Sequence, residues 1–404
     1  MLNYTESLSA QMLLSNIRAQ SNWGNTVRSL SRSTTAWAVI AIIAVGAGAA
    51  GVLVATGGHP GRASSGASRH ATAARHPAAH ATPLRLVSVT PANGSRAVNG
   101  TRDITVTFNE PLPAAAPLPL LSPAIAGAWQ REGVTAVFTP QSGFTARTRV
   151  TVTVPVADGA PRSGYKSTFT TAAYSALRLQ QLLAQLGYLP STWQPAAGAA
   201  IPAGSAAAQL AAAYGPPPGT FRWQDGYPHE LYSFWKQGSD NLLVTGAITG
   251  FEADHQMAPD GVAGPAVWAA LLRAAATGAR NTHGYSYAIA SQGSPESLTI
   301  WHNGHYVFSS PANTGISIAP TPVGTFPVYE KLPYQVMQGT NPDGSHYADP
   351  VQWVSYFSGG SAVHYIARGS YGWPQSLGCV ELPYAAAQQS YGYLPYGTLV
   401  TVTP

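Results

Sequence analysis

A run of 21 residues without a charged side chain, positions 36–56, divides this chain into two unequal parts. As a helix the run would be about 31 Å long, the thickness of the hydrocarbon core of a bilayer. We therefore predict one transmembrane helix over residues 36–56, preceded by a cytoplasmic tail over residues 1–35. A cleaved signal peptide is the alternative, although its apolar core would normally be shorter and nearer the N-terminus. Arginines flank the run on both sides, so charge alone leaves its orientation open.

Composition favours β-structure and turns in the rest of the chain. Only 9% of the residues are charged, whereas 41 are Gly and 33 are Pro. Such a composition indicates short strands and many turns rather than a helical bundle. The net charge of +5 suits an anionic wall or membrane surface. No basic stripe interleaved with aromatic residues occurs beyond the linker, so no nucleic-acid partner is implied.

Two segments follow the uncharged run. Residues 57–83 are mostly Ala, Gly, Ser, His and Pro, a composition that cannot bury a core, and they are predicted to be a flexible linker. In residues 84–172, Val or Ile alternates with Thr at 104–108 and again at 150–154. This period of two is typical of half-buried strands, and its length of about ninety residues predicts an immunoglobulin-like β-sandwich.

Residues 175–280 show helical periods instead. Leucines at 179, 182, 183 and 186 form one apolar face that ends at Gly187, a helix stop signal, and two further helices are predicted near 248–255 and 266–275. The order Asp-Gly, Gly-Pro, Trp, Leu from Asp260 onward resembles the small peptidoglycan-binding repeat, here with residues 191–240 inserted between its halves. Both dipeptides are also ordinary turns, so a spacer without a ligand groove is the alternative.

The last segment, residues 285–404, begins with a hairpin signal. Asn303-Gly304 lies between two β-rich runs, which is the strongest short-range indication of a hairpin. His302 and His305 flank this turn and could suggest zinc, but no Glu or Cys completes a ligand set. The sequence gives no reason to expect a metal or another cofactor.

Cys379 is the only cysteine of the chain, so it has no intramolecular disulfide partner. A lone Cys is often a small buried hydrophobe, but three neighbours favour a reactive thiol. Gly378 lets main-chain amides approach a ligand closely, and His364 ends an apolar, strand-like run fifteen positions upstream. The loop at 368–375 is long enough to fold back and bring imidazole to thiol. Together these residues predict a nucleophile, a base and amide donors for an oxyanion.

The stretch Ser376-Leu-Gly-Cys379-Val, with His364 and Thr321-Pro-Val-Gly-Thr-Phe326 upstream, resembles the signature of the YkuD family of L,D-transpeptidases, which are cell-wall enzymes. The resemblance covers about residues 285–404. It implies that Cys379 is the acylated nucleophile and His364 its base. It also implies that Ser376 contacts the substrate.

The chain departs from the family pattern after the base and around the nucleophile. Leu377 stands where the family usually has a second His, and Glu381 where it often has Arg or Asn. The residue after the base is Tyr365 rather than Ser, so we expect a main-chain carbonyl to orient the imidazole. By the same resemblance Tyr347 is the side-chain oxyanion donor beside the amide of Gly378. Tyr334 either contacts the substrate or packs in a lid.

The resulting prediction is a multidomain, mainly β protein with one N-terminal transmembrane helix, an Ig-like sandwich, a small α-helical peptidoglycan-binding-like domain and a YkuD-type catalytic domain. The resemblance implies that it joins peptidoglycan tetrapeptide stems by 3-3 crosslinks through a thioester on Cys379, outside the cell membrane and facing the wall. Carbapenem β-lactams are the implied inhibitors. The alternatives are an L,D-carboxypeptidase on the same stems, in which water replaces the acceptor amine, and a wall-binding anchor without activity.

Overall fold

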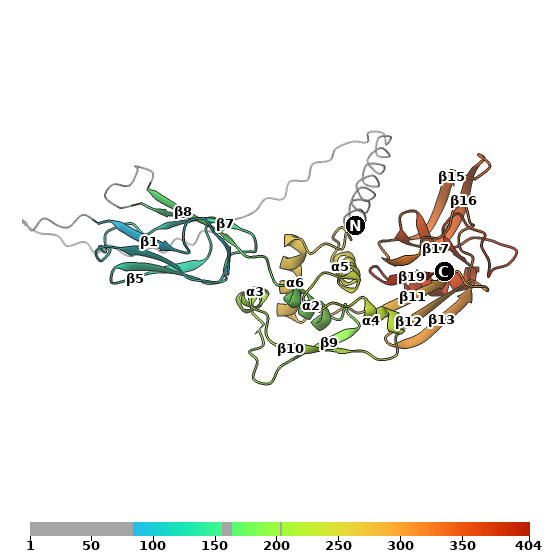
Figure 1. Cartoon of the computed structure of the whole chain (residues 1–404), viewed down its shortest axis with the longest axis horizontal. Coiled ribbons are helices and arrows are strands. Elements are labelled where there is room, and N and C mark those ends of the chain that lie inside the picture. Colours follow the sequence, from blue (N-terminus) through green and yellow to red (C-terminus); the bar gives the residue numbers. More distant parts are fainter. Residues whose placement is uncertain (1–83, 156–163, 203) are drawn as a thin grey trace, which may run out of the picture. The chain divides into compact units, whose positions relative to one another are not determined.

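A computed structural model describes residues 84–155, 164–202 and 204–404 (Figure 1). The predicted tail, transmembrane helix and linker therefore lie outside the described residues. In the part of the chain that is described, no helix is both long and apolar enough to cross a membrane. The described residues all belong to one compact unit.

The first described domain is a sandwich of two four-stranded sheets, as predicted. One sheet has the order β1-β3-β6-β5 and the other β2-β8-β7-β4. The apolar residues of the alternating runs face inward: Ile104 and Val106 of one sheet and Val150 and Val152 of the other are all buried in one core. The strands are β1 Leu86–Thr90, β2 Ser95–Val98, β3 Ile104–Phe108, β4 Leu120–Ser122, β5 Gly127–Glu132, β6 Thr135–Pro140, β7 Arg149–Val154 and β8 Tyr165–Thr171.

The second segment is helical, also as predicted. Ser175 caps the first helix through its hydroxyl, which accepts from the Arg178 N–H, and Gly187 follows the helix end with φ +82°. The region predicted as an insertion forms a two-stranded antiparallel sheet and two helices. The elements are α2 Ala176–Gln185, β9 Ser191–Pro195, α3 Ala206–Tyr214, β10 Gly219–Trp223, α4 His229–Ser233, α5 Leu242–Asp254 and α6 Pro265–Thr277.

The helical segment shares its core with the C-terminal domain. Leu243 and Phe251 of α5 belong to the same buried cluster as Tyr287 and Leu399 of the C-terminal sheet. The helix approaches this sheet closely because Gly246 has no side chain: a Cβ there would lie 2.5 Å from the carbonyl oxygen of Gly397. The helices therefore support the sheet that follows, and residues 175–280 as an independent domain remain a prediction.

The C-terminal domain contains a five-stranded sheet, β13-β12-β11-β19-β14, and a four-stranded sheet, β15-β16-β17-β18. Leu298 and Ile300 from the first sheet and Val363 and Val380 from the second meet in one buried core. The predicted hairpin at Asn303-Gly304 is confirmed, since β12 and β13 pair as antiparallel neighbours. The elements are β11 Ser286–Ser291, β12 Ser297–His302, β13 His305–Pro311, β14 Gly324–Pro327, β15 Glu330–Thr340, β16 His346–Ser358, β17 Ser361–Tyr365, β18 Val380–Leu382, α7 Tyr384–Tyr393 and β19 Leu399–Thr403.

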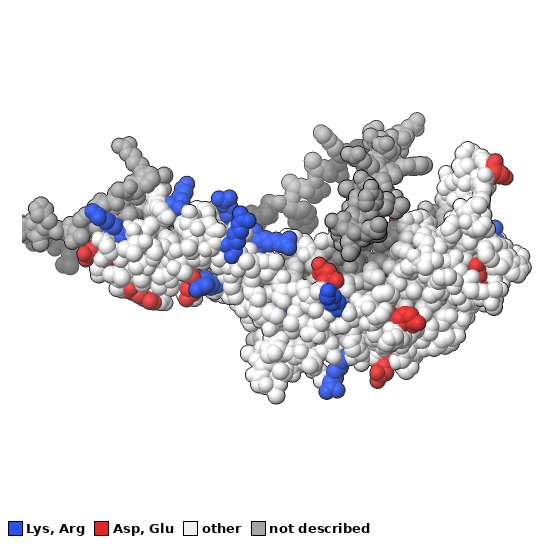
Figure 2. Space-filling view, in the orientation of Figure 1, with Lys and Arg blue, Asp and Glu red and all other residues white. Residues whose placement is uncertain are grey.

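Two features of the surface bear on the site. Strands β15 and β16 form a long antiparallel hairpin that extends away from the five-stranded sheet (Figure 1). Acidic and basic side chains are few and scattered across a mainly uncharged face (Figure 2). That face accords with the low charged content of the sequence.

Candidate active site

Strand pairing brings the predicted nucleophile and base into one sheet. Cys379 immediately precedes β18, which runs parallel to β17, the strand that carries His364. In this register Val363 lies opposite Val380, and His364 lies opposite Glu381. The loop between the two strands therefore folds back, as the sequence predicts.

Two buried hydroxyl groups stabilise the turn that presents Cys379 through hydrogen bonds. The Ser376 hydroxyl donates to the Cys379 carbonyl oxygen at 2.7 Å and accepts from the Gly378 N–H at 3.1 Å. The Thr321 hydroxyl reaches the same carbonyl oxygen at 3.4 Å and accepts from the Gly315 N–H at 2.8 Å. Gly378 has φ +110°, a conformation that favours glycine. The structure thus places Ser376 as a support of the turn, and its contact with a substrate remains a prediction.

The loop before this turn is fixed to a neighbouring segment. The carbonyl oxygen of Thr314 accepts from the N–H groups of Gln375 and Ser376, each at 3.0 Å. Thr314 is itself held by the buried Glu296, whose carboxylate accepts from its N–H at 2.6 Å and from its hydroxyl at 2.7 Å. The loop between His364 and Cys379 is consequently anchored at its C-terminal end.

The thiol of Cys379 is neutral in the resting structure. Its sulfur donates to the carbonyl oxygen of Gly360 at 3.8 Å. The pKa of the Cys379 thiol is raised to about 11, chiefly by burial; the main chain of Ala362 opposes this shift, and the negative charge of Glu381 adds a smaller increase. A base is therefore required before the sulfur can attack a carbonyl carbon at neutral pH.

The imidazole of His364 is also neutral and almost fully buried, at 2% exposure. Burial lowers its pKa below the ordinary value, while the main chain of Tyr365 and the charge of Glu381 oppose this shift. Among the described residues, Nδ1 has no hydrogen-bond partner. The main-chain carbonyl expected to orient the ring therefore makes no hydrogen bond to Nδ1. The resting sulfur points to Gly360 rather than to this ring.

Three tyrosines in or next to strands β15 and β16 lie within electrostatic reach of the thiol. Burial raises the pKa of Tyr347, and a negative charge on Cys379 raises it further, which places this hydroxyl within electrostatic reach of the sulfur. Tyr329 and Tyr356 respond to Cys379 in the same way. No pattern in the sequence points to these two tyrosines, since only the tertiary fold brings them toward the thiol. Tyr334 lies on β15 with 54% of its surface exposed, which leaves both of its predicted roles open.

Glu381, which departs from the family pattern, forms an ion pair with Arg368. Its carboxylate is 3% exposed and accepts from Arg368 Nε at 2.8 Å and from Arg368 Nη2 at 2.6 Å. A charged residue inside an apolar strand requires such a partner, and this requirement is the signal by which Arg368 could have been found. The pair ties the start of the loop after His364 to the strand after Cys379.

The arrangement can perform covalent acyl chemistry. It offers a thiol, a neutral imidazole able to accept the thiol proton, and hydroxyl and main-chain donors for an oxyanion. The predicted amide donor Gly378 already donates to Ser376 and would have to share its hydrogen. No group of three or more His, Cys, Asp or Glu able to hold a metal ion occurs in residues 84–155, 164–202 and 204–404.

Comparison with protein families matches two parts of the chain. Residues 286–402 match the YkuD model, described as the L,D-transpeptidase catalytic domain. Residues 80–171 match the Big_5 model, a bacterial Ig-like domain. The helical segment lies between the two matched ranges. No curated protein matches the chain.

Several solved structures are similar to the chain. An L,D-transpeptidase from Mycobacterium smegmatis is 17% identical, with 80% of this chain and 100% of that chain covered and a TM-score of 0.28. The L,D-transpeptidase LdtMt1 in complex with imipenem is 16% identical, with 80% and 100% covered and a TM-score of 0.28. The catalytic domain of the Enterococcus faecium L,D-transpeptidase is 25% identical, with 29% and 96% covered and a TM-score of 0.27. Because these TM-scores are low, the assignment depends on the family models.

Proposed function

Residues 286–402 are an L,D-transpeptidase catalytic domain of the YkuD family, the chain is therefore an enzyme of that class, and from this premise we propose that it forms 3-3 crosslinks between peptidoglycan tetrapeptide stems. In this proposal Cys379 is the nucleophile and His364 the base. The intermediate is a thioester between Cys379 and the third residue of the donor stem.

The pairing of strands β17 and β18 is the observation that carries the proposal. It holds the only cysteine of the chain, on a braced turn, beside the strand of a buried and neutral histidine. A buried neutral imidazole accepts a proton more readily than one that is already charged. The same domain provides tyrosine hydroxyls within electrostatic reach of the sulfur.

In the first half-reaction the thiol proton passes to the imidazole of His364. The sulfur then forms a bond to the carbonyl carbon of the third stem residue, and the carbonyl oxygen takes the displaced electron pair. Tyr347 and main-chain amides at the turn donate to this oxyanion. When the carbon–nitrogen bond breaks, the terminal D-alanine leaves as the amine and takes the proton from the imidazolium.

In the second half-reaction an amine from the third residue of a neighbouring stem attacks the thioester. Its proton passes to His364, the carbon–sulfur bond breaks, and the thiol is restored by the same proton. One amide bond is lost and one is formed, so no external energy source is needed. Because the sulfur donates to Gly360 at rest, it must turn away from this carbonyl before the first step.

Mass spectrometry of the full chain with purified disaccharide-tetrapeptide tests the proposal. We expect a dimer that has lost one D-alanine with the natural protein and no dimer with Cys379→Ala. Leu377→Ala is the matched control, because this side chain is exposed beside the turn and is not assigned a chemical role.

The other outcomes point to the alternatives. Loss of D-alanine without a dimer would show that water, not an amine, reaches the thioester, and the enzyme would be a carboxypeptidase. No turnover and no acyl adduct on Cys379 in a folded protein would leave a wall-binding protein without activity.

We also infer that a carbapenem acylates Cys379, since the solved complex of LdtMt1 holds imipenem. The expected result is a mass increase equal to one inhibitor molecule on the natural protein and none on Cys379→Ala. An equal increase on both proteins would show that the inhibitor reacts elsewhere.

For location, we propose that residues 36–56 anchor the chain in the cell membrane and that residues 57–83 lead to the wall side. Support comes from the uncharged run and from the wall substrate of the enzyme class. We expect detergent, but not high salt, to extract the protein from isolated membranes.

Binding of residues 175–280 to peptidoglycan is a separate proposal, which co-sedimentation of the full chain with purified sacculi tests.

A further inference from the structure

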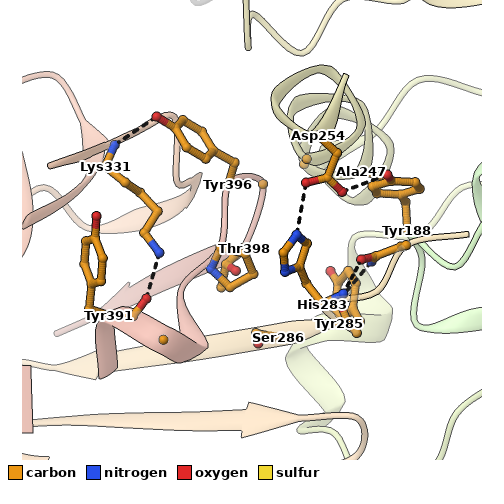
Figure 3. Close-up of a pocket in the computed structure, with 17 residues that line it drawn as sticks. Tyr188, Ala247, Asp254, His283, Tyr285, Ser286, Lys331, Tyr391, Tyr396 and Thr398 are labelled. Carbon is orange, nitrogen blue, oxygen red and sulfur yellow. Dashed lines mark hydrogen bonds and ion pairs between the residues drawn. The ribbon is translucent and has the colours of Figure 1, made fainter. Parts of the chain in front are cut away.

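A cavity of about 360 Å³ lies where helix α5 faces the loop before strand β19, and no step of the mechanism uses it (Figure 3). Its walls come from the helical segment, from residues 281–286, from β15, and from α7 with the loop after it. Neither Cys379 nor His364 lines it. The cavity therefore lies outside the catalytic centre.

The two walls are fixed relative to each other by direct main-chain contact. Gly246 and Gly250 of α5 pack against the main chain at Tyr396 and Gly397, where a Cβ at Gly250 would lie 3.0 Å from the Tyr396 carbonyl oxygen. Ligand sites in proteins are usually formed before the ligand arrives, and their volumes begin at about 300 Å³. The cavity meets both conditions.

Lys331 provides a cation on one side of the cavity. Its ammonium donates to the Tyr391 carbonyl oxygen at 2.7 Å and lies 3.9 Å from the centre of the Tyr391 ring. In the described residues neither of the two ion pairs involves Lys331. Burial lowers the pKa of Lys331 to about 8, so the charged form still predominates at neutral pH. An ammonium has three donors, and a partly buried one without a counter-ion favours an anionic ligand.

Asp254 provides an anion from a different element. Its carboxylate accepts from the Tyr188 hydroxyl at 2.8 Å and lies 3.2 Å from His283 Nε2. Each oxygen thus has one partner and retains capacity for another donor. Figure 3 shows Lys331 and Asp254 on separate sides of the cavity.

We propose that this cavity binds an amino-acid zwitterion, with the ligand carboxylate on Lys331 and the ligand ammonium on Asp254. Two sources carry this chemistry: a free amino acid, such as released D-alanine, and a peptide with a free amine and a free carboxylate, such as the tetrapeptide stem. The choice of these two probes rests on the proposed function, whereas the charges of the cavity do not.

Isothermal titration calorimetry on the full chain with Cys379→Ala tests the site without turnover. The probes are D-alanine, disaccharide-tetrapeptide, N-acetyl-D-alanine, which lacks the ammonium, and D-alanine amide, which lacks the carboxylate. Because this background cannot react, binding is measured whether or not the natural protein is a transpeptidase. Failure of the site and failure of the proposed function are therefore distinguishable.

We expect at least one of the two natural probes to bind. When D-alanine binds, each of its blocked derivatives should bind about tenfold or more weakly than D-alanine. Lys331→Met and Asp254→Asn should each weaken the bound probe by about tenfold or more, whereas Lys331→Arg retains it. Lys166→Met is the matched control, because Lys166 is exposed on β8 of the Ig-like domain. Binding of the tetrapeptide alone identifies the stem as the source, and binding of D-alanine identifies the free amino acid.

Three results would overturn the proposal. They are absence of binding by both natural probes, equal affinity of free and blocked D-alanine when D-alanine binds, and unchanged affinity of the bound probe in the Lys331→Met protein. Thermal unfolding of each variant shows whether it is folded. If Lys331→Met is not, the blocked derivatives and Asp254→Asn decide the outcome.

Discussion

Removal of the Arg368 side chain is expected to destabilise the C-terminal domain because it leaves a buried carboxylate without its cation. Glu381 is 3% exposed, and its two strong donors both come from Arg368, at 2.8 and 2.6 Å. After Arg368→Ala the remaining contact is the Asn313 amide at 3.5 Å, at the limit of hydrogen-bond distance. The carboxylate would then be both buried and nearly unpartnered.

The expected loss is about 3 kcal/mol in the free energy of unfolding. Removal of one partner from a buried ion pair costs about 3–5 kcal/mol. We take the lower end because 32% of the Arg368 side chain is exposed, so water already screens part of the interaction. For a domain of this size the loss corresponds to a decrease of about 6–12 °C in the unfolding midpoint.

Thermal unfolding of the full chain, followed by tryptophan fluorescence, measures this loss. Arg273→Ala is the matched control, since Arg273 is exposed on α6 and its change should stay within about 0.5 kcal/mol. The double variant Arg368→Met with Glu381→Met should recover most of the stability, because it removes both charges together. Crosslinking by Arg368→Ala should also fall, since the pair ties together the strands of His364 and Cys379.

Equal midpoints for Arg368→Ala and Arg273→Ala would refute the reasoning. So would a double variant that is no more stable than Arg368→Ala, because the loss would then come from packing of the arginine stem and not from an unpaired charge.

The rate at which iodoacetamide alkylates Cys379 in the resting protein, followed by mass spectrometry, should increase about tenfold per pH unit until the pH reaches the thiol pKa of about 11, which is far above the range of a free thiol. A plateau of this rate near pH 8.5 would contradict the prediction. Because burial lowers the pKa of His364, protonation of its imidazole should reduce kcat/KM only below pH 6.5. A loss of activity that begins above this pH would exclude the buried imidazole as the base. Ser376→Ala removes two hydrogen bonds under the nucleophile and should lower the free energy of unfolding by about 1–2 kcal/mol, which urea unfolding measures. Crosslinking activity should fall as well, which the dimer assay measures. Gly246→Ala should cost about 1–3 kcal/mol because its Cβ would meet a carbonyl oxygen at 2.5 Å, whereas Gly392→Ala in helix α7 has open space and should be neutral or stabilising.

Local patterns in the sequence were sufficient for much of the fold. The Val and Thr alternation at 104–108 and 150–154 predicted strands because a period of two places one side of a strand against a core. Asn303-Gly304 predicted the β12–β13 hairpin because both residues tolerate positive φ, observed at 49° and 77°. The leucine period predicted α2, and Gly187 its end.

The sharing of a core by the helical segment and the C-terminal sheet could not be predicted in this way. Leu243 and Tyr287 look like core residues of two separate domains in the sequence, and nothing local indicates that they meet. The close approach at Gly246 depends on a backbone more than a hundred residues away. Such contacts depend on surface complementarity between distant elements, which no short pattern encodes.

At the candidate site the sequence by itself determined the chemical groups: one thiol, an imidazole fifteen positions before it, and a glycine that allows the turn. Only the tertiary structure decided their states and supports. Burial raises the pKa of the Cys379 thiol and lowers that of the His364 imidazole, so it favours the neutral form of each group, and burial is a property of the packed chain. The tertiary structure likewise decided that Arg368 pairs with Glu381 and that the Thr321 hydroxyl lies beneath Cys379. Strand pairing and loop closure bring these residues together although they are distant in the sequence.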